Sequence, residues 1–154
     1  MFTRILVCLD RSPVAEQVLP YATAQAQAFH ATLVLLHIIP EPYIATPSIP
    51  GTSILPVQNP VDLHNLPDEE KKATRYLSGI TEEVQEQGIN VETVVLQGEA
   101  RQTIIEYALG NGIDLIAIAT HGRGGLGKVF YGSVAEQLLK KSGLPILLIR
   151  AKSS

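Results

Sequence analysis

Five short stretches of the chain are rich in apolar residues, and helix-forming segments separate them. Such runs are typical of parallel strands that are covered on both faces. The pattern predicts strands at about 5–9, 31–39, 90–96, 113–119 and 146–149, and helices at about 12–29, 68–87, 99–110 and 133–142. Strict alternation of strand and helix predicts a single doubly wound five-stranded parallel sheet, an α/β fold with helices on both faces.

Proline, serine and leucine positions refine two of the predicted helices. Ser12 followed by Pro13 suits the cap and first residue of the first helix. Pro20 falls inside that helix and is expected to kink it, because proline lacks the N–H group that a helix interior requires. In the last helix, Val134, Leu138 and Leu139 are expected to face the core.

The segment at about 40–67 contains seven of the ten prolines in the chain. So many missing N–H groups oppose regular structure, which predicts a long irregular loop. A loop of this length is usually a lid, a surface for a protein partner or a partly disordered segment. No linker and no internal repeat divide the sequence, so residues 1–154 are expected to form one domain.

Composition excludes several classes of protein. The 154 residues are 45% hydrophobic and 18% charged, with a net charge of −3, so we expect neither a nucleic-acid partner nor a membrane partner. The apolar run at 5–9 is too short for a signal peptide or a membrane span. Cys8 is the single cysteine and cannot form an intrachain disulfide, which favours a cytoplasmic location and an inert, buried thiol.

Polar residues follow two of the predicted strands. Asp10 comes after the first, and Thr120-His121-Gly122 comes after the fourth. Ligands of doubly wound sheets bind outside the carboxyl ends of the strands, at the point where the strand order reverses. If these two strands are neighbours, both polar groups border the same crevice.

A glycine-rich segment at 119–133 joins the fourth strand to the last helix. Glycines allow close approach of the backbone to an anion, and a helix N-terminus offers free N–H groups, so we expect phosphate binding rather than a purely structural loop. Gly122-x-Gly124-x-x-Gly127 matches the dinucleotide fingerprint but does not open a helix directly. Gly122-x4-Gly127-Lys128 lacks the hydroxyl residue of a P-loop, since Val129 follows.

The whole chain resembles the universal stress protein family over about residues 2–150. Its nucleotide-binding members carry Gly-x2-Gly-x9-Gly-Ser/Thr after the fourth strand, and Ala119-x2-Gly122-x9-Gly132-Ser133 is similar to it, with alanine at the first glycine. The start, Ile5 to Ser12, is similar to the family's first strand and its acidic residue. The resemblance implies a Rossmann-like, adenine nucleotide alpha-hydrolase-like fold that binds ATP, with Mg²⁺ or Mn²⁺ held by the phosphates and not directly by the protein.

The resemblance also implies which residues form the site. The implied nucleotide-binding residues are Cys8, Leu9, Asp10, Ile38, Ala119, Thr120, His121, Gly122, Arg123, Gly132, Ser133 and Val134. Asp10 would contact the adenosine, Ile38 the adenine through its backbone, and Gly132 with Ser133 the phosphates. Arg11 stands where the family commonly has a small residue, and is expected either to form an outward ion pair or to reach the ligand.

The histidines carry no recognisable catalytic or metal-binding pattern. The four show no metal-ligand spacing, and no serine, cysteine or aspartate is placed to form a triad with His121. His37 lies in an apolar strand and is expected to be a hydrogen-bonded core histidine. We therefore predict no catalytic residue.

The last predicted strand is expected at the edge of the sheet, where an apolar strand invites pairing with another chain. Its residues are Ile146, Leu147, Leu148 and Ile149. The family resemblance implies a homodimer built there, so the favoured function is a stress-signalling homodimer that responds to ATP. Three alternatives stay open: a slow ATPase or self-phosphorylating protein, a nucleotide-free dimeric scaffold whose partner binds the 40–67 loop, and a sensor of AMP or a cyclic adenine dinucleotide.

Overall fold

The computed structural model describes residues 1–41, 66–121 and 132–152. The elements are β1 (Arg4–Cys8), α1 (Pro13–Glu16), α2 (Leu19–Phe29), β2 (Thr32–Ile39), α3 (Leu66–Gln85), β3 (Val91–Gln97), α4 (Ala100–Gly110), β4 (Leu115–His121), α5 (Ser133–Lys141) and β5 (Ile146–Ala151). The predicted alternation of strands and helices is confirmed, with bounds that shift by a few residues.

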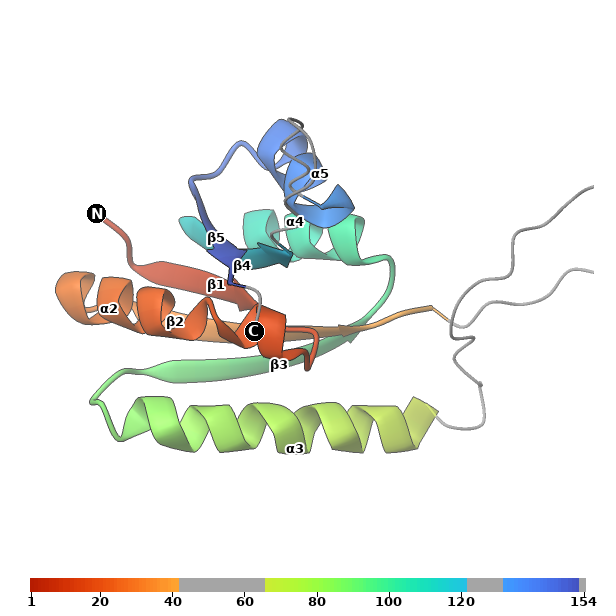
Figure 1. Ribbon diagram of the computed structural model, residues 1–154, viewed down its shortest axis with the longest axis horizontal. Coiled ribbons are helices and arrows are strands. Elements are labelled where there is room, and N and C mark those ends of the chain that lie inside the picture. Colours follow the sequence, from red (N-terminus) through yellow and green to blue (C-terminus); the bar gives the residue numbers. More distant parts are fainter. Residues whose placement is uncertain (42–65, 122–131, 153–154) are drawn as a thin grey trace, which may run out of the picture.

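All five strands form one parallel sheet in the order β3-β2-β1-β4-β5 (Figure 1). In the centre, Ile5 of β1 pairs with Leu33 of β2 on one side and with Leu115 of β4 on the other. The predicted fold class is therefore confirmed, and β1 and β4 are neighbours at the point where the strand order reverses. β5 lies at one edge of the sheet, as expected, and β3 at the other.

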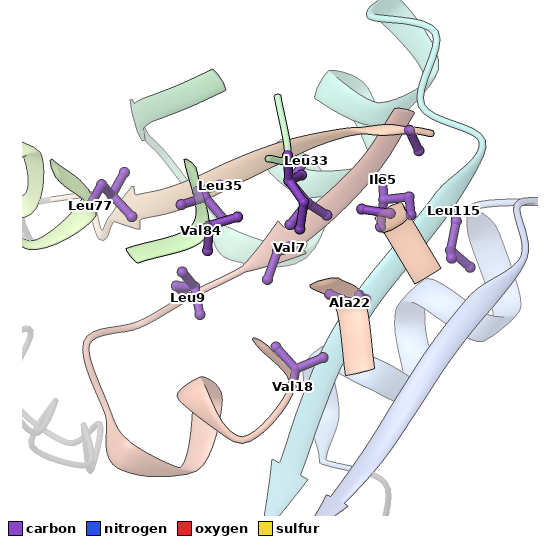
Figure 2. Close-up of a cluster of buried hydrophobic side chains, with 14 of the residues drawn as sticks. Ile5, Val7, Leu9, Val18, Ala22, Leu33, Leu35, Leu77, Val84 and Leu115 are labelled. Carbon is purple, nitrogen blue, oxygen red and sulfur yellow. The ribbon is translucent and has the colours of Figure 1, made fainter. Parts of the chain in front are cut away.

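Helices cover both faces of the sheet, with α2 and α3 on one side and α4 and α5 on the other (Figure 1). Side chains alternate along each strand, so Ile5 and Val7 of β1 enter the core beneath α2 and α3, which Figure 2 shows, while Leu6 enters the core beneath α4 and α5. Each fully buried leucine or isoleucine contributes roughly 1.5–3 kcal/mol to folding. The two cores fix the register of β1 and β4 and thus the place where both strands end.

The predicted first helix is divided into two. α1 ends at Glu16, α2 begins at Leu19, and Pro20 lies in the first turn of α2. Proline is tolerated in the first turn because an N–H group there would have no acceptor within the helix. A break between two helices therefore replaces the expected kink. Likewise α3 begins at Leu66, two residues earlier than predicted, with Pro67 in its first turn.

Two further predictions have different outcomes. Leu138 is fully buried, but Leu139 is 51% exposed. Consecutive residues of an α-helix lie about 100° apart around its axis, so the two side chains point in different directions. The expectation that both leucines face the core is therefore wrong for Leu139.

Most of the predicted 40–67 loop falls outside the described residues. Within the described ranges, no helix combines the length and apolar character that crossing a membrane requires.

Candidate functional site

A pocket of about 300 Å³ lies at the carboxyl ends of β1 and β4, next to the start of α5. Its lining includes nine of the twelve residues that the sequence predicted: Cys8, Leu9, Asp10, Ile38, Ala119, Thr120, Gly132, Ser133 and Val134. These residues come from four elements and from turns far apart in the sequence. The structure therefore brings most of the predicted site residues to one place.

The remaining three predicted residues cannot be placed at the pocket. Gly122 and Arg123 lie outside the described residues, and so does the side chain of His121, although its backbone ends β4. The structure also adds pocket residues that the sequence interpretation missed: Ala15, Leu36, Ala100, Ile104, Ile118 and Ala135. The period of two along a strand could have identified Leu36 and Ile118, which precede Ile38 and Thr120 by two positions on the same strands.

One wall of the pocket is apolar. Leu36 and Ile38 of β2, Ile118 of β4 and Ile104 of α4 all belong to the core beneath α4 and α5. Cys8 packs against the same core, and burial raises the pKa of its thiol to about 12, so the thiol stays protonated near neutral pH. This wall suits a flat apolar group such as an aromatic base.

A tight turn after β1 carries the acidic residue of the site. Asp10 accepts a hydrogen bond at Oδ1 from the Ser12 N–H (2.9 Å), and Ser12 Oγ accepts one from the Ala15 N–H (3.1 Å), which caps α1. Between them Arg11 has a φ of 66°, a left-handed conformation that costs a residue other than glycine about 1–3 kcal/mol. The turn leaves Asp10 exposed at the mouth of the pocket.

The Arg11 side chain forms an ion pair with α3. Its Nη2 lies 2.8 Å from Glu69 Oε2, and Lys72 Nζ lies 3.0 Å from Glu69 Oε1. Hydrogen bonds from Lys72 and Arg11 hold the pKa of Glu69 below its usual value. Of the two expectations for Arg11, the structure therefore supports the outward ion pair.

The N-terminus of α5 forms the opposite side of the pocket. Gly132 has φ 67° and ψ 150° and precedes the helix, whose first hydrogen bond to this residue runs from the Glu136 N–H to the Gly132 carbonyl oxygen at 3.1 Å. The N–H groups of residues 133–135 therefore have no acceptor within the helix, and these residues line the pocket. Free N–H groups at the positive end of a helix dipole suit a phosphate or another anion.

The close contact between Gly132 and Thr120 explains why a glycine precedes α5. A Cβ atom on Gly132 would lie 3.3 Å from Thr120 Oγ1, and the positive φ already disfavours a side chain. Glycine thus lets the turn pack against the end of β4. The structure therefore places the Gly-Ser helix start beside the end of the fourth strand.

His37 lies behind the pocket as the expected core histidine. It is 4% exposed, and its Nδ1 lies 2.8 Å from the Leu9 carbonyl oxygen. A carbonyl oxygen only accepts, so Nδ1 carries the hydrogen. Burial lowers the pKa of His37 in spite of this hydrogen bond. The histidine is therefore a neutral donor that fixes the end of β1.

Side chains alone do not form a metal centre in the part of the chain that the structure describes. No three histidine, cysteine, aspartate or glutamate side chains gather there closely enough to hold an ion.

Comparison with known proteins relates the chain to one family. The family model described as "Universal stress protein family" matches residues 1–150. Universal stress protein YxiE of Bacillus subtilis is 29% identical over 97% of this chain and 100% of its own length. The solved structure of MJ0577, a universal stress protein of Methanocaldococcus jannaschii, superposes with a TM-score of 0.72 and 25% identity, covering 100% of this chain and 99% of that one.

Similar folds have been solved with adenine nucleotides bound. A universal stress protein in complex with cAMP has a TM-score of 0.66 and 17% identity, covering 98% of each chain. An Arabidopsis thaliana member with AMP bound has a TM-score of 0.65 and 13% identity, covering 98% of this chain and 93% of its own. A protein of Archaeoglobus fulgidus in complex with dAMP has a TM-score of 0.63 and 18% identity, covering 97% and 98%.

The family match spans nearly the whole chain, and the solved relatives share its sheet and helix arrangement. On this basis, the chain belongs to the universal stress protein family.

Proposed function

We propose that the protein binds an adenine nucleotide, and ATP in particular, in the pocket between β1 and β4. One observation carries the proposal: an apolar wall, the Asp10 carboxylate and the free N–H groups of α5 border a single cavity. These are the three surfaces that a base, a ribose and a phosphate chain require. Relatives of the same fold that bind AMP, cAMP and dAMP support the choice of adenine.

The arrangement favours one orientation of the ligand. The adenine would pack against Ile38 and Ile118, and the ribose hydroxyls would donate to Asp10. The phosphates would then accept hydrogen bonds from Ser133 and the first N–H groups of α5. A divalent ion, Mg²⁺ or Mn²⁺, would be held by the phosphates.

Calorimetry on the purified protein tests this proposal. Mass spectrometry of the denatured protein first establishes whether a nucleotide has co-purified, because an occupied site would hide binding. Titration with ATP and magnesium should then saturate near one molecule per chain, and parallel titrations with AMP, cAMP and a cyclic adenine dinucleotide would rank the ligands. The absence of binding to a folded, empty protein would overturn the proposal and favour the nucleotide-free scaffold.

Ala119 offers a sharper test of the scaffold alternative. It lines the pocket where the family motif has glycine. Should the Ala119 methyl group crowd the ribose, Ala119→Gly would strengthen nucleotide binding. A wild-type protein that binds nothing and an Ala119→Gly variant that binds ATP would mean that this methyl group disables the site.

We also propose that two copies of the chain associate through β5. The strand lies at the edge of the sheet, and its residues Ile146–Ile149 are apolar and half-buried, so its edge can pair with a second strand. The variant Leu148→Pro removes one N–H group from this strand and should reduce the mass measured by light scattering from dimer to monomer. Circular dichroism must confirm that the variant still folds, and a folded variant of unchanged mass would contradict the proposal.

The wider role remains a prediction. We infer that nucleotide binding changes the dimer and so signals stress in the cytoplasm, and light scattering with and without ATP tests the first step. Turnover of ATP above that of a variant with a blocked pocket would instead favour a slow ATPase.

A further inference from the structure

Three polar contacts, made by the side chains of His37, Glu69 and Tyr76 from outside the pocket lining, hold the segment from Leu9 to Glu16. This segment supplies Leu9, Asp10 and Ala15 to the pocket. The contacts come from β2 and α3, which belong to other parts of the chain. They join the turn that carries Asp10 to β2 and α3.

The first contact fixes the start of the segment. His37 Nδ1 donates to the Leu9 carbonyl oxygen, while the Leu9 N–H donates to the Leu36 carbonyl oxygen at 2.9 Å. Leu36 and His37 are consecutive residues of β2. Both polar backbone groups of Leu9 are thus bound to β2, and the chain leaves the sheet at a defined point before Asp10.

The second and third contacts come from one helix. Arg11 binds Glu69 at 2.8 Å, and the Tyr76 hydroxyl donates to Glu16 Oε1 at 3.0 Å. Glu69 and Tyr76 are seven residues apart, which places them on the same face of α3 two turns from one another. Arg11 precedes the capping residue Ser12 and Glu16 is the last residue of α1, so α3 contacts this short helix at both of its ends.

The two contacts to α3 differ in exposure, because the Tyr76–Glu16 hydrogen bond is partly buried whereas the ion pair lies at the surface. The Glu69 side chain is 24% exposed and that of Arg11 36%, and the Tyr76 ring packs on the same core cluster as Leu9 and Leu77, both labelled in Figure 2. Partial burial reduces screening by water. The ion pair accompanies the left-handed conformation of Arg11.

We propose that Glu69 and Tyr76 of α3 are positioning residues of the nucleotide pocket, which hold the Asp10 turn in the geometry that accepts the ligand. The inference rests on the proposed nucleotide site. It assigns to α3 a role in ligand affinity although α3 contributes no residue to the pocket lining. The Arg11 residue, unusual at this position, is then the connection between the turn and the helix.

The decisive variant combines Glu69→Gln with Tyr76→Phe, because each change removes the polar contact and keeps the size of the side chain. The matched control combines Glu70→Gln with Tyr21→Phe, since Glu70 and Tyr21 are exposed. A charge exchange, Arg11→Glu with Glu69→Arg, should restore much of the lost affinity if the contact between the two side chains is what matters.

Hydrogen exchange of the ligand-free protein provides the first measurement. The N–H groups of Ser12, Ala15 and Glu16 are hydrogen-bonded within the turn, and in the double variant they should exchange about tenfold faster, the effect of losing two modest hydrogen bonds. Amides in β4 should exchange as before. Calorimetry with ATP and magnesium should give about tenfold weaker affinity with unchanged stoichiometry.

The outcomes separate this inference from the proposed function. Unchanged exchange in the turn overturns the inference, whether or not a nucleotide binds. Faster exchange with unchanged affinity also overturns it, because the turn would then be held for stability alone. Failure of the wild type to bind any adenine nucleotide would overturn the proposed function and, with it, the role of α3 in affinity, even if exchange shows that α3 holds the turn.

Discussion

At the amino ends of the strands, charged side chains bind one another and the backbone. Asp114 Oδ2 accepts from the Thr3 N–H and the Thr3 hydroxyl, both at 2.7 Å, and its Oδ1 accepts from the Arg4 N–H at 3.1 Å. The Arg4 guanidinium makes a bidentate pair with Glu92 at 2.7 and 2.8 Å and also donates to the Asn111 carbonyl oxygen. These groups are satisfied by the protein itself.

At the carboxyl ends, the polar groups border an open pocket. Asp10 accepts one hydrogen bond from its own turn, and the first N–H groups of α5 have no acceptor within the helix. The difference teaches that polar residues at one end of the sheet bind one another, whereas those at the other end border a pocket. Changes at the two ends should therefore have separable effects on stability and on binding.

The largest effect concerns Cys8, which lies in the pocket but is not expected to take part in thiol chemistry. With its pKa raised to about 12, the thiol should react with iodoacetamide at pH 8 about a thousandfold more slowly than a free cysteine, because only the thiolate reacts. The rate should recover when the protein is unfolded in guanidinium. A folded-state rate close to the unfolded one would mean that the carboxyl end contains a reactive nucleophile.

The next largest effect is expected from Gly132→Val. A β-branched residue at a φ of 67° is strained, and its Cβ would press on Thr120, so nucleotide affinity should fall about 100-fold, equivalent to about 2.7 kcal/mol. Gly143→Val is the matched control, because Gly143 lies beyond the other end of α5 with a φ of 66° and open surroundings. Both variants should be less stable, but equal losses of affinity would contradict the placement of the phosphates.

Asp114→Asn tests whether the polar contacts at the amino ends of the strands stabilise the fold. Burial opposes ionisation of Asp114, but the hydrogen bonds from Thr3 and Arg4 outweigh it and hold its pKa below the usual value. The variant should lose about 2 kcal/mol of unfolding free energy in urea at pH 7 with unchanged nucleotide affinity.

The pH dependence of Asp114→Asn has a definite sign. Because the pKa of Asp114 is lowered in the folded state, its ionised carboxylate adds stability at pH values above the unfolded-state pKa of about 4. This stability is lost as the pH falls through the folded-state pKa. The difference between wild type and variant should therefore shrink below about pH 4. The same change at the carboxyl ends of the strands, Asp10→Asn, should cost more free energy of nucleotide binding than free energy of unfolding. A larger loss of unfolding free energy than of binding free energy would contradict the comparison.

The smallest effect is expected from Ser133→Ala. Loss of one hydrogen bond to a phosphate should weaken nucleotide binding about five- to tenfold in calorimetry. Ser78→Ala is a suitable control, because the Ser78 hydroxyl bonds only its own helix. An affinity equal to that of wild type would mean that the backbone N–H groups alone bind the phosphate.

Periodicity and strand ends carry most of what the sequence can predict. Apolar runs identified the five strands, and the polar residues Asp10 and Thr120 correctly indicated that β1 and β4 are neighbours. The glycine pattern with Ser133 located the start of α5. These signals are local, since each depends on residues within one strand or one turn.

The remaining features depend on contacts between distant parts of the chain. The hydrogen bonds of Arg4 with Glu92 and of Asp114 with Thr3 join residues 88 and 111 positions apart, and they require the register of the sheet to be known. Ala100 and Ile104 enter the pocket only because α4 packs on the same face as α5. The division of the first helix at residues 17–18 was missed because Pro20 can either kink a helix or open a new one.

The most direct test of the account is a titration of ¹⁵N-labelled protein with ATP and magnesium, followed by amide chemical shifts. We expect the largest shifts at residues 10–12, at Ile38 and at residues 133–135, with Thr3, Arg4, Glu92 and Asp114 unmoved. Saturable shifts that cluster at the amino ends of the strands, or no shifts in a folded and empty protein, would contradict the claim that the carboxyl end of this sheet is a nucleotide site.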